Sequence, residues 1–217
     1  MVRKIAVALL ASTLFGVLPA HAQLGGLLGG KGSGSAASSS VPDAAAQEAL
    51  VRKFVAARVP EMNAQVEFAK AFGLAEQAQA LEVQKQALSS GAVDKDALEK
   101  AREVGASAQK QIDAKMAEKP ALDAEAKQHY TEGLTSLALA VIAGKQLTDE
   151  AQTFANGVKS AKGAEALTLA TKLAAGVYVA KETPGYLGSL TGSTKSALTF
   201  ARANDIKVPE NADSLAF

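Results

Sequence analysis

The chain has 217 residues, 48 % of them hydrophobic, and its 23 lysines and arginines nearly balance its 22 aspartates and glutamates. This balance gives no electrostatic reason to expect nucleic-acid binding, and the absence of cysteine excludes disulfide bonds and a lipid-modified cysteine. The chain must therefore hold its fold by burying a core. Abundant alanine, with aromatic residues at only 5 %, favours helices over strands.

The first 22 residues have the pattern of a secretory signal peptide. Arg3 and Lys4 precede an apolar run over residues 5–18, and Ala-His-Ala at 20–22 forms a cleavage signal. We expect cleavage after this triplet and export to the periplasm or the extracellular space, between which the sequence does not choose. An uncleaved membrane anchor is the alternative, but the apolar run is shorter than the roughly 20 residues that span a bilayer. Removing residues 1–22 changes the formal charge from +1 to −1, because two basic residues and no acidic one are lost.

Residues 23–42 are expected to form a flexible linker, because they are rich in glycine and serine and lack an apolar face. The segment contains a near match to the phosphate-binding loop that ends in Gly30 and Lys31. That motif needs serine or threonine next, to reach magnesium, and this chain has Gly32. We therefore expect no nucleotide site. The alternative to a simple tether is that the Leu24–Leu28 segment docks on a partner.

Apolar residues recur at helical spacing from residue 43 to residue 205, and no long segment alternates cleanly as a strand would. The predicted fold class is all-α: an elongated antiparallel bundle of about six helices, without a sheet, forming one domain over 43–205. An extended tail is expected over 206–217. The expected helical segments are Ala44–Arg58, Glu61–Ser89, Asp94–Glu118, Asp123–Gly144, Thr148–Lys159, Gly163–Ala180 and Tyr186–Ala203.

Capping and breaking residues set the expected ends of these helices. Asp43 and Asp94 are favourable N-cap residues, and Thr148 is expected to cap the short helix that follows it. Pro60 is expected to end or kink the first helix, because the residue before a proline is pushed out of the helical region. Pro184 is expected to end the helix before it for the same reason.

The segment Gly163–Ala180 is apolar on several faces and is predicted to be the central helix, covered by protein on every side. Glu165 and Lys172 interrupt it, and it is too short to span a bilayer. Gly176 lies where neighbouring helices are expected to come closest. The side chains expected to carry the core are Phe54, Phe68, Phe72, Leu167, Leu173, Val177 and Tyr178.

Two patterns of small residues predict close packing between helices. The first is a heptad-like seam that implies close antiparallel packing on the preceding helix. Its members are Leu98, Ala101, Gly105, Ala108 and Ile112. The second is the four-residue spacing of Gly188, Gly192 and Ser196. We expect this stripe to pack against the central helix, with self-association as the alternative.

His129 is the one histidine outside the expected signal peptide, and it shares a helix face with Glu125 and Glu132. A di-iron bundle site needs Glu-x-x-His twice with two further glutamates, and a zinc site with one histidine and no cysteine is unusual. The sequence therefore predicts no metal site and no cofactor. Catalysis is not expected either, because a serine nucleophile needs a base beside it and no G-x-S-x-G elbow occurs.

Together these features predict an exported, non-enzymatic helical bundle that acts through protein–protein contacts in the envelope or outside the cell. The expected partner is another protein or a second copy of the chain, and not nucleic acid. After signal cleavage the chain is expected to be soluble, with peripheral envelope association left open. The alternative is a periplasmic carrier of a lipid or other apolar small molecule, which an internal void of roughly 300 Å³ or more would favour. Its support is the apolar character of Leu134–Ala143 and Gly163–Ala180.

Overall fold

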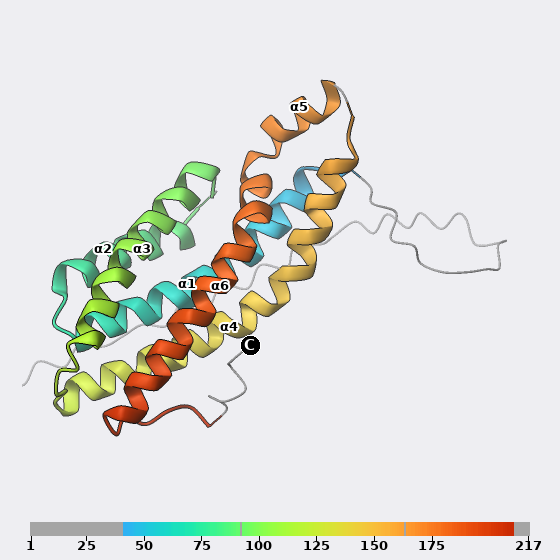
Figure 1. The fold of residues 1–217 in the computed structure, drawn as a ribbon. Helices are drawn as coiled ribbons and strands as arrows, with labels where there is room; N and C mark the ends of the chain where they lie inside the picture. The colour runs from blue at the N-terminus through green and yellow to red at the C-terminus, as the bar shows by residue number, and fades with distance from the viewer. Residues whose placement is uncertain (1–40, 92, 163, 211–217) are drawn as a thin grey trace, which may run out of the picture. The chain divides into compact units, whose positions relative to one another are not determined.

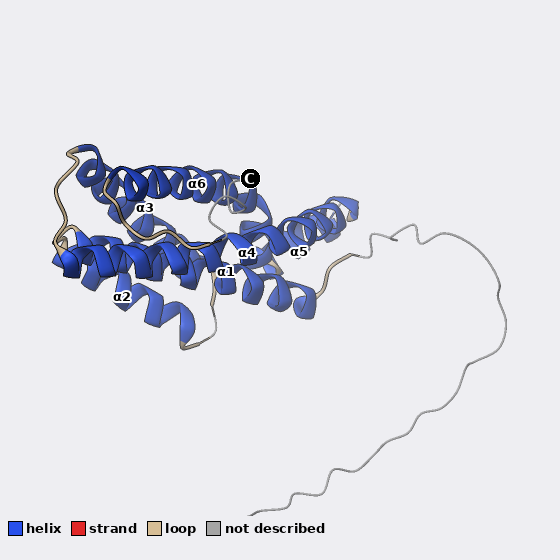
Figure 2. Ribbon diagram, turned by 90° about the horizontal axis from the view of Figure 1, so that it is seen from below, coloured by secondary structure: helices blue, strands red, loops and turns tan. Residues whose placement is uncertain are grey.

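The computed structural model describes residues 41–91, 93–162 and 164–210. This part of the chain forms six α-helices and no strand (Figures 1 and 2), so the predicted all-α bundle is confirmed. Within the same residues no helix is both long enough and apolar enough to cross a membrane. The expected signal peptide, nearly all of the expected linker and most of the expected tail lie outside the described residues.

Helix α1, Ala44–Ala71, is the central helix of the bundle and contacts α2, α3, α4 and α6. Between residues 61 and 69 every side chain except that of Asn63 is buried. The prediction that Gly163–Ala180 is central is therefore wrong. Hydropathy alone did not identify α1, because several of its buried side chains are polar and are paired within the core. These residues are Arg58, Glu61, Gln65 and Glu67.

Helix α1 ends at Ala71, two residues before Gly73, and not at Pro60, which lies inside the helix. Gly73 has φ +68°, a left-handed conformation that favours glycine. Its amide donates to the carbonyl of Lys70 at 3.0 Å, and the amide of Leu74 donates to that of Ala69 at 2.8 Å. This pair of bonds is the Schellman arrangement that closes a helix. Pro60 lacks only one backbone donor, and packing on both sides of it keeps the helix continuous.

Helices α2, Ala75–Ser89, and α3, Lys95–Ala117, form a hairpin that packs on α1 (Figure 1). Asp94 caps α3 by accepting a hydrogen bond from the amide of Ala97 at 2.8 Å, as expected, and Asp43 caps α1 in the same way. The seam predicted on α3 is buried throughout, which confirms that this is its packing face.

Helix α4, Ala124–Ser160, is a single helix, so the predicted break between Gly144 and Thr148 is wrong. Gly144 faces α6, where an added Cβ atom would lie 3.0 Å from Leu187 and 3.3 Å from Leu190. Glycine is therefore used here for a close helix contact and not for a turn. Near the start of α4, the fully buried Tyr130 donates a hydrogen bond to the carbonyl of Ala197 in α6 at 3.1 Å, and this bond ties the two helices together.

The expected central segment is divided at Leu173 into α5, Ala164–Lys172, and α6, Ala174–Ala203. Leu167 of α5 is 75 % exposed, so its predicted place in the core is wrong. Helix α6 continues through Pro184, against the prediction that it ends there. Pro184 lies on the exposed side of α6, where water can reach the carbonyl group that the proline leaves unpaired.

The other predicted core residues are buried or half-buried. Phe54, Phe68, Leu173 and Tyr178 are buried, and Phe72 and Val177 are partly buried against the core. The stripe Gly188, Gly192 and Ser196 lies on the exposed face of α6, and an added Cβ atom at either glycine would meet nothing within 4 Å. The expected packing of this stripe is therefore wrong.

Candidate functional site

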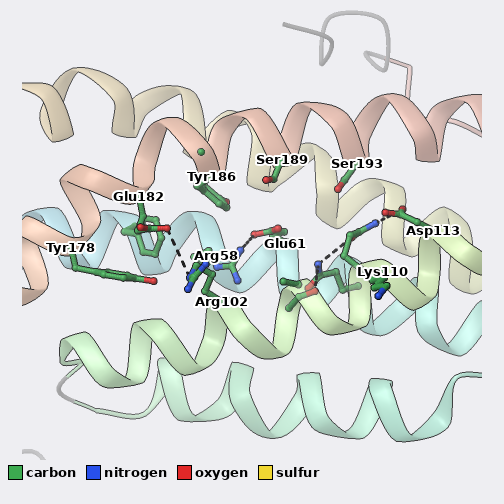
Figure 3. Close-up of a pocket in the computed structure, with 16 residues that line it drawn as sticks. Arg58, Glu61, Arg102, Lys110, Asp113, Tyr178, Glu182, Tyr186, Ser189 and Ser193 are labelled. Carbon is green, nitrogen blue, oxygen red and sulfur yellow. Dashed lines mark hydrogen bonds and ion pairs between the residues drawn. The ribbon is translucent and has the colours of Figure 1, made fainter.

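A groove of about 540 Å³ runs between α3 and α6, with α1 as its floor (Figure 3). Arg58, Glu61 and Gln65 of α1 line it. Their spacing of three and four residues places these side chains on one face of the helix. This polar face of the otherwise well-covered helix α1 borders the groove.

Arg58 and Glu61 form a buried ion pair on the floor of the groove. Arg58 also donates to the carbonyl oxygen of Ala101 in α3 at 3.1 Å and lies over the ring of Tyr186, 5.4 Å from its centroid. Burial raises the pKa of Glu61 above its ordinary value, and the attraction and hydrogen bonding of Arg58 only partly oppose this. The ion pair with Arg58 thus holds the Glu61 carboxylate at a buried position that disfavours its negative charge.

Three residues that line the groove each have a buried polar atom without a hydrogen-bond partner: Oε1 of Gln65 and the hydroxyl groups of Tyr178 and Tyr186. Among the described residues these are the only buried side-chain atoms of this kind. Each of the three side chains is at most 7 % exposed. Arg102 lies near the Tyr178 hydroxyl, and Glu61 lies near the Tyr186 hydroxyl. Each neighbour affects the pKa of its tyrosine, but neither contact has the geometry of a hydrogen bond. A buried polar group without a partner is costly, so the groove is prepared to receive hydrogen bonds.

The walls of the groove carry small residues. Gly105 and Ala106 lie on α3, and Gly185, Ser189 and Ser193 lie on α6. Glycine at position 105 is required by the floor, because an added Cβ atom would lie 2.9 Å from a guanidinium nitrogen of Arg58. Because these side chains are small, a polypeptide backbone can approach the helices that form the walls of the groove closely.

Charged side chains stand at both ends of the groove. Arg102 and Glu182 form a 3.9 Å ion pair near Tyr178, and Lys110 and Asp113 lie toward the other end (Figure 3). Acidic and basic side chains are equal in number along the whole lining. The groove therefore offers hydrogen bonds without a net charge. Its lining contains serines but no histidine to act as their base.

A second polar cluster lies on the face of α1 that meets α4. Oε2 of Glu67 lies 2.7 Å from Nδ1 of His129, and Oε1 accepts a hydrogen bond from Lys70 at 2.7 Å. Burial acts to raise the pKa of Glu67, but the hydrogen bonds and charges of Lys70 and His129 outweigh it and hold the pKa below its ordinary value. Glu132 completes a group of three candidate metal ligands, whereas Glu125, which the sequence places on the same face, is not part of it.

Of the other hollows among the described residues, two bear on function. One of about 640 Å³, near the start of α1 and the end of α2, is larger than the groove, but none of the three unpaired buried atoms lines it. The other, about 320 Å³, is an open cleft between α4 and α6. It is lined by Phe154, Ala155, Val158, Val177 and Ala180, with Lys159 and Lys181 beside them.

Sequence reasoning missed the groove because it ended the first helix at Pro60. That break separated Arg58 from Glu61 and Gln65, although their regular spacing within an apolar helix was a usable signal. It missed Glu67 as a neighbour of His129 because the two residues are 62 positions apart. Protein-family models, curated proteins and solved structures gave no significant match to this chain.

Proposed function

We propose that this protein is exported and acts without catalysis, by binding a segment of a partner protein in the groove between α1, α3 and α6. The observation that carries the proposal is that the three residues with an unpaired buried polar atom all line this groove. Each of the three atoms is itself shielded from solvent, so a bound segment would supply the missing partners once these side chains rotate toward the groove. The pattern of the first 22 residues is the support for export.

A polypeptide backbone suits the chemistry of the lining. A backbone amide can donate to Oε1 of Gln65, and backbone carbonyls can accept from the hydroxyls of Tyr178 and Tyr186. The groove carries no excess of either charge, so it favours a ligand that is itself close to neutral. The small residues on both walls leave room for main chain, and the tyrosine rings provide the amphipathic contact area that is common in protein interfaces.

Ser189→Trp tests this function by filling the groove from α6. Ser189 is exposed and lines the groove, so the substitution should leave the fold intact while occupying the space of the ligand. We expect the affinity for the partner to fall at least about tenfold, which is about 1.4 kcal/mol. The readout is the amount of partner that co-purifies with tagged protein from its native source, and the oligomeric state if the partner is a second copy.

Ser196→Trp is the matched control, because Ser196 is exposed on the same helix but does not line the groove. It should retain the partner. Equal loss in both variants, or retention in both while they remain folded, would contradict binding in the groove.

The second candidate function is a carrier of an apolar small molecule, favoured by the cleft between α4 and α6. Its lining is mainly apolar and its volume of about 320 Å³ is at the lower end of ligand pockets. Lys159 and Lys181 would attract the anionic head of a fatty acid or lipid. Native mass spectrometry of the purified protein distinguishes the two functions, since a carrier would retain a lipid of defined mass and Ser189→Trp would not remove it.

A further inference from the structure

We propose that Glu67, His129 and Glu132 form a zinc site between α1 and α4. Their candidate ligand atoms all lie within 4.8 Å of one another. The sequence predicts no metal site because it offers one histidine with neighbouring glutamates on a single exposed helix face. Glu67 changes that reasoning, because it adds a buried carboxylate from the central helix.

The pair formed by Glu67 and His129 is the fixed part of the site. Oε2 of the carboxylate lies 2.7 Å from Nδ1 of the imidazole, so in the absence of metal a proton is shared between these two atoms. On binding, zinc takes the place of this hydrogen bond, and Nδ1 and Oε2 become ligands. A proton on Nδ1 moves to Nε2 when the imidazole is neutral and leaves to solvent when it is an imidazolium. Lys70 remains on the other carboxylate oxygen, 2.7 Å away, where it holds the orientation of Glu67 as outer partners of metal ligands do.

Glu132 is the mobile part of the site. It is exposed and accepts only a hydrogen bond from Gln128 at 3.1 Å among the bonds described for it. Zinc binds imidazole nitrogen and carboxylate oxygen at about 2.0–2.2 Å, which places the ligand atoms of a tetrahedral site about 3.4 Å apart. The Glu67–His129 pair must therefore open slightly from 2.7 Å, and Glu132 must move inward. An exposed glutamate can make that movement by changing its rotamer.

The donor set selects zinc over the harder cations. One imidazole nitrogen and two carboxylate oxygens match the sites that supply three protein ligands and leave the fourth position of the tetrahedron to water. Magnesium and calcium prefer six or more oxygen ligands. The exposed side of the cluster, at Glu132, provides both the water position and a path for the ion.

Isothermal titration of the full chain with Zn²⁺ alone tests the site. We expect one ion per chain. The zinc affinity should fall at least about tenfold in His129→Ala and in Glu132→Gln, because the loss of an outer-shell partner alone lowers metal affinity about 10- to 100-fold. The control is Glu125→Gln on the same helix, which should bind zinc as the parent chain does. With Co²⁺ as a probe, the absorption bands of a tetrahedral site should appear in the parent chain and in the control.

Absence of zinc binding by the parent chain would overturn the proposal, as would equal binding by Glu132→Gln and the parent. Because Glu132 is exposed, its substitution keeps the test valid even if His129→Ala fails to fold. The ligands of the proposed site do not line the groove. Zinc binding and binding of a partner segment therefore succeed or fail independently.

Discussion

Gly176→Leu is expected to lower the melting temperature of the protein. Gly176 is buried in the first turn of α6, and an added Cβ atom alone would lie 2.5–3.1 Å from three ring carbons of Phe154 in α4. Phe154 is itself 5 % exposed and cannot move aside easily. Overpacking of this kind costs about 1–3 kcal/mol, whereas replacing a helical glycine returns less than about 1 kcal/mol. The balance is destabilising, and thermal unfolding followed by circular dichroism measures it.

Gly192→Ala is the matched control on the same helix. Gly192 is exposed, and an added Cβ atom would meet nothing within 4 Å. The better helix propensity of alanine should therefore leave the melting temperature unchanged or raise it slightly. A Gly176→Leu protein as stable as the parent would mean that α4 and α6 do not approach closely at this point.

Arg58→Met is expected to destabilise the fold by about 3–5 kcal/mol, the usual cost of breaking a buried ion pair by removing one partner. The substitution leaves the Glu61 carboxylate buried without its cation and the carbonyl of Ala101 without its donor. Denaturant unfolding of the variant and the parent gives the free-energy difference. Arg58→Met/Glu61→Met is the comparison, and it should recover much of the loss because neither charge remains buried.

The effect of Arg58→Met should also depend on pH. Burial already raises the pKa of Glu61 above 4.5, and removal of Arg58 takes away the interaction that opposes this rise. The folded variant then takes up a proton at a higher pH than the unfolded chain does. Its deficit relative to the parent should therefore be largest near neutral pH and should shrink as the pH falls toward 4.5. A deficit that stays constant over this range would show that Glu61 is not the source of the loss.

The helical class followed from composition and periodicity, but several helix ends did not. Pro60 and Pro184 were treated as ends because the residue before a proline is pushed out of the helical region. Both lie inside long helices, since one missing bond is offset by the side-chain packing on either side. Gly73 closes α1 just after its last residue, Ala71, because its positive φ allows two capping bonds that no sequence pattern guarantees.

The candidate sites were less predictable than the fold, because each depends on pairs of residues far apart in the sequence. Gln65 lines the groove with Tyr186, and Glu67 meets His129, only because α1 lies at the centre of the bundle. Hydropathy favoured the segment 163–180 as the centre. Hydropathy gave no weight to α1, because the buried charges of this helix are neutralised by partners that only the folded structure shows.

Photo-crosslinking in the native setting tests the central claim, that the groove binds a partner polypeptide, most directly. A photoreactive amino acid at Ser189, which lines the groove, is compared with the same residue at Ser196, which is exposed outside it. We predict that Ser189 yields a crosslink to one defined polypeptide segment, identified by mass spectrometry, and that Ser196 does not. Equal crosslinking at both positions, no crosslink at either, or a lipid attached at Ser189 would contradict the claim.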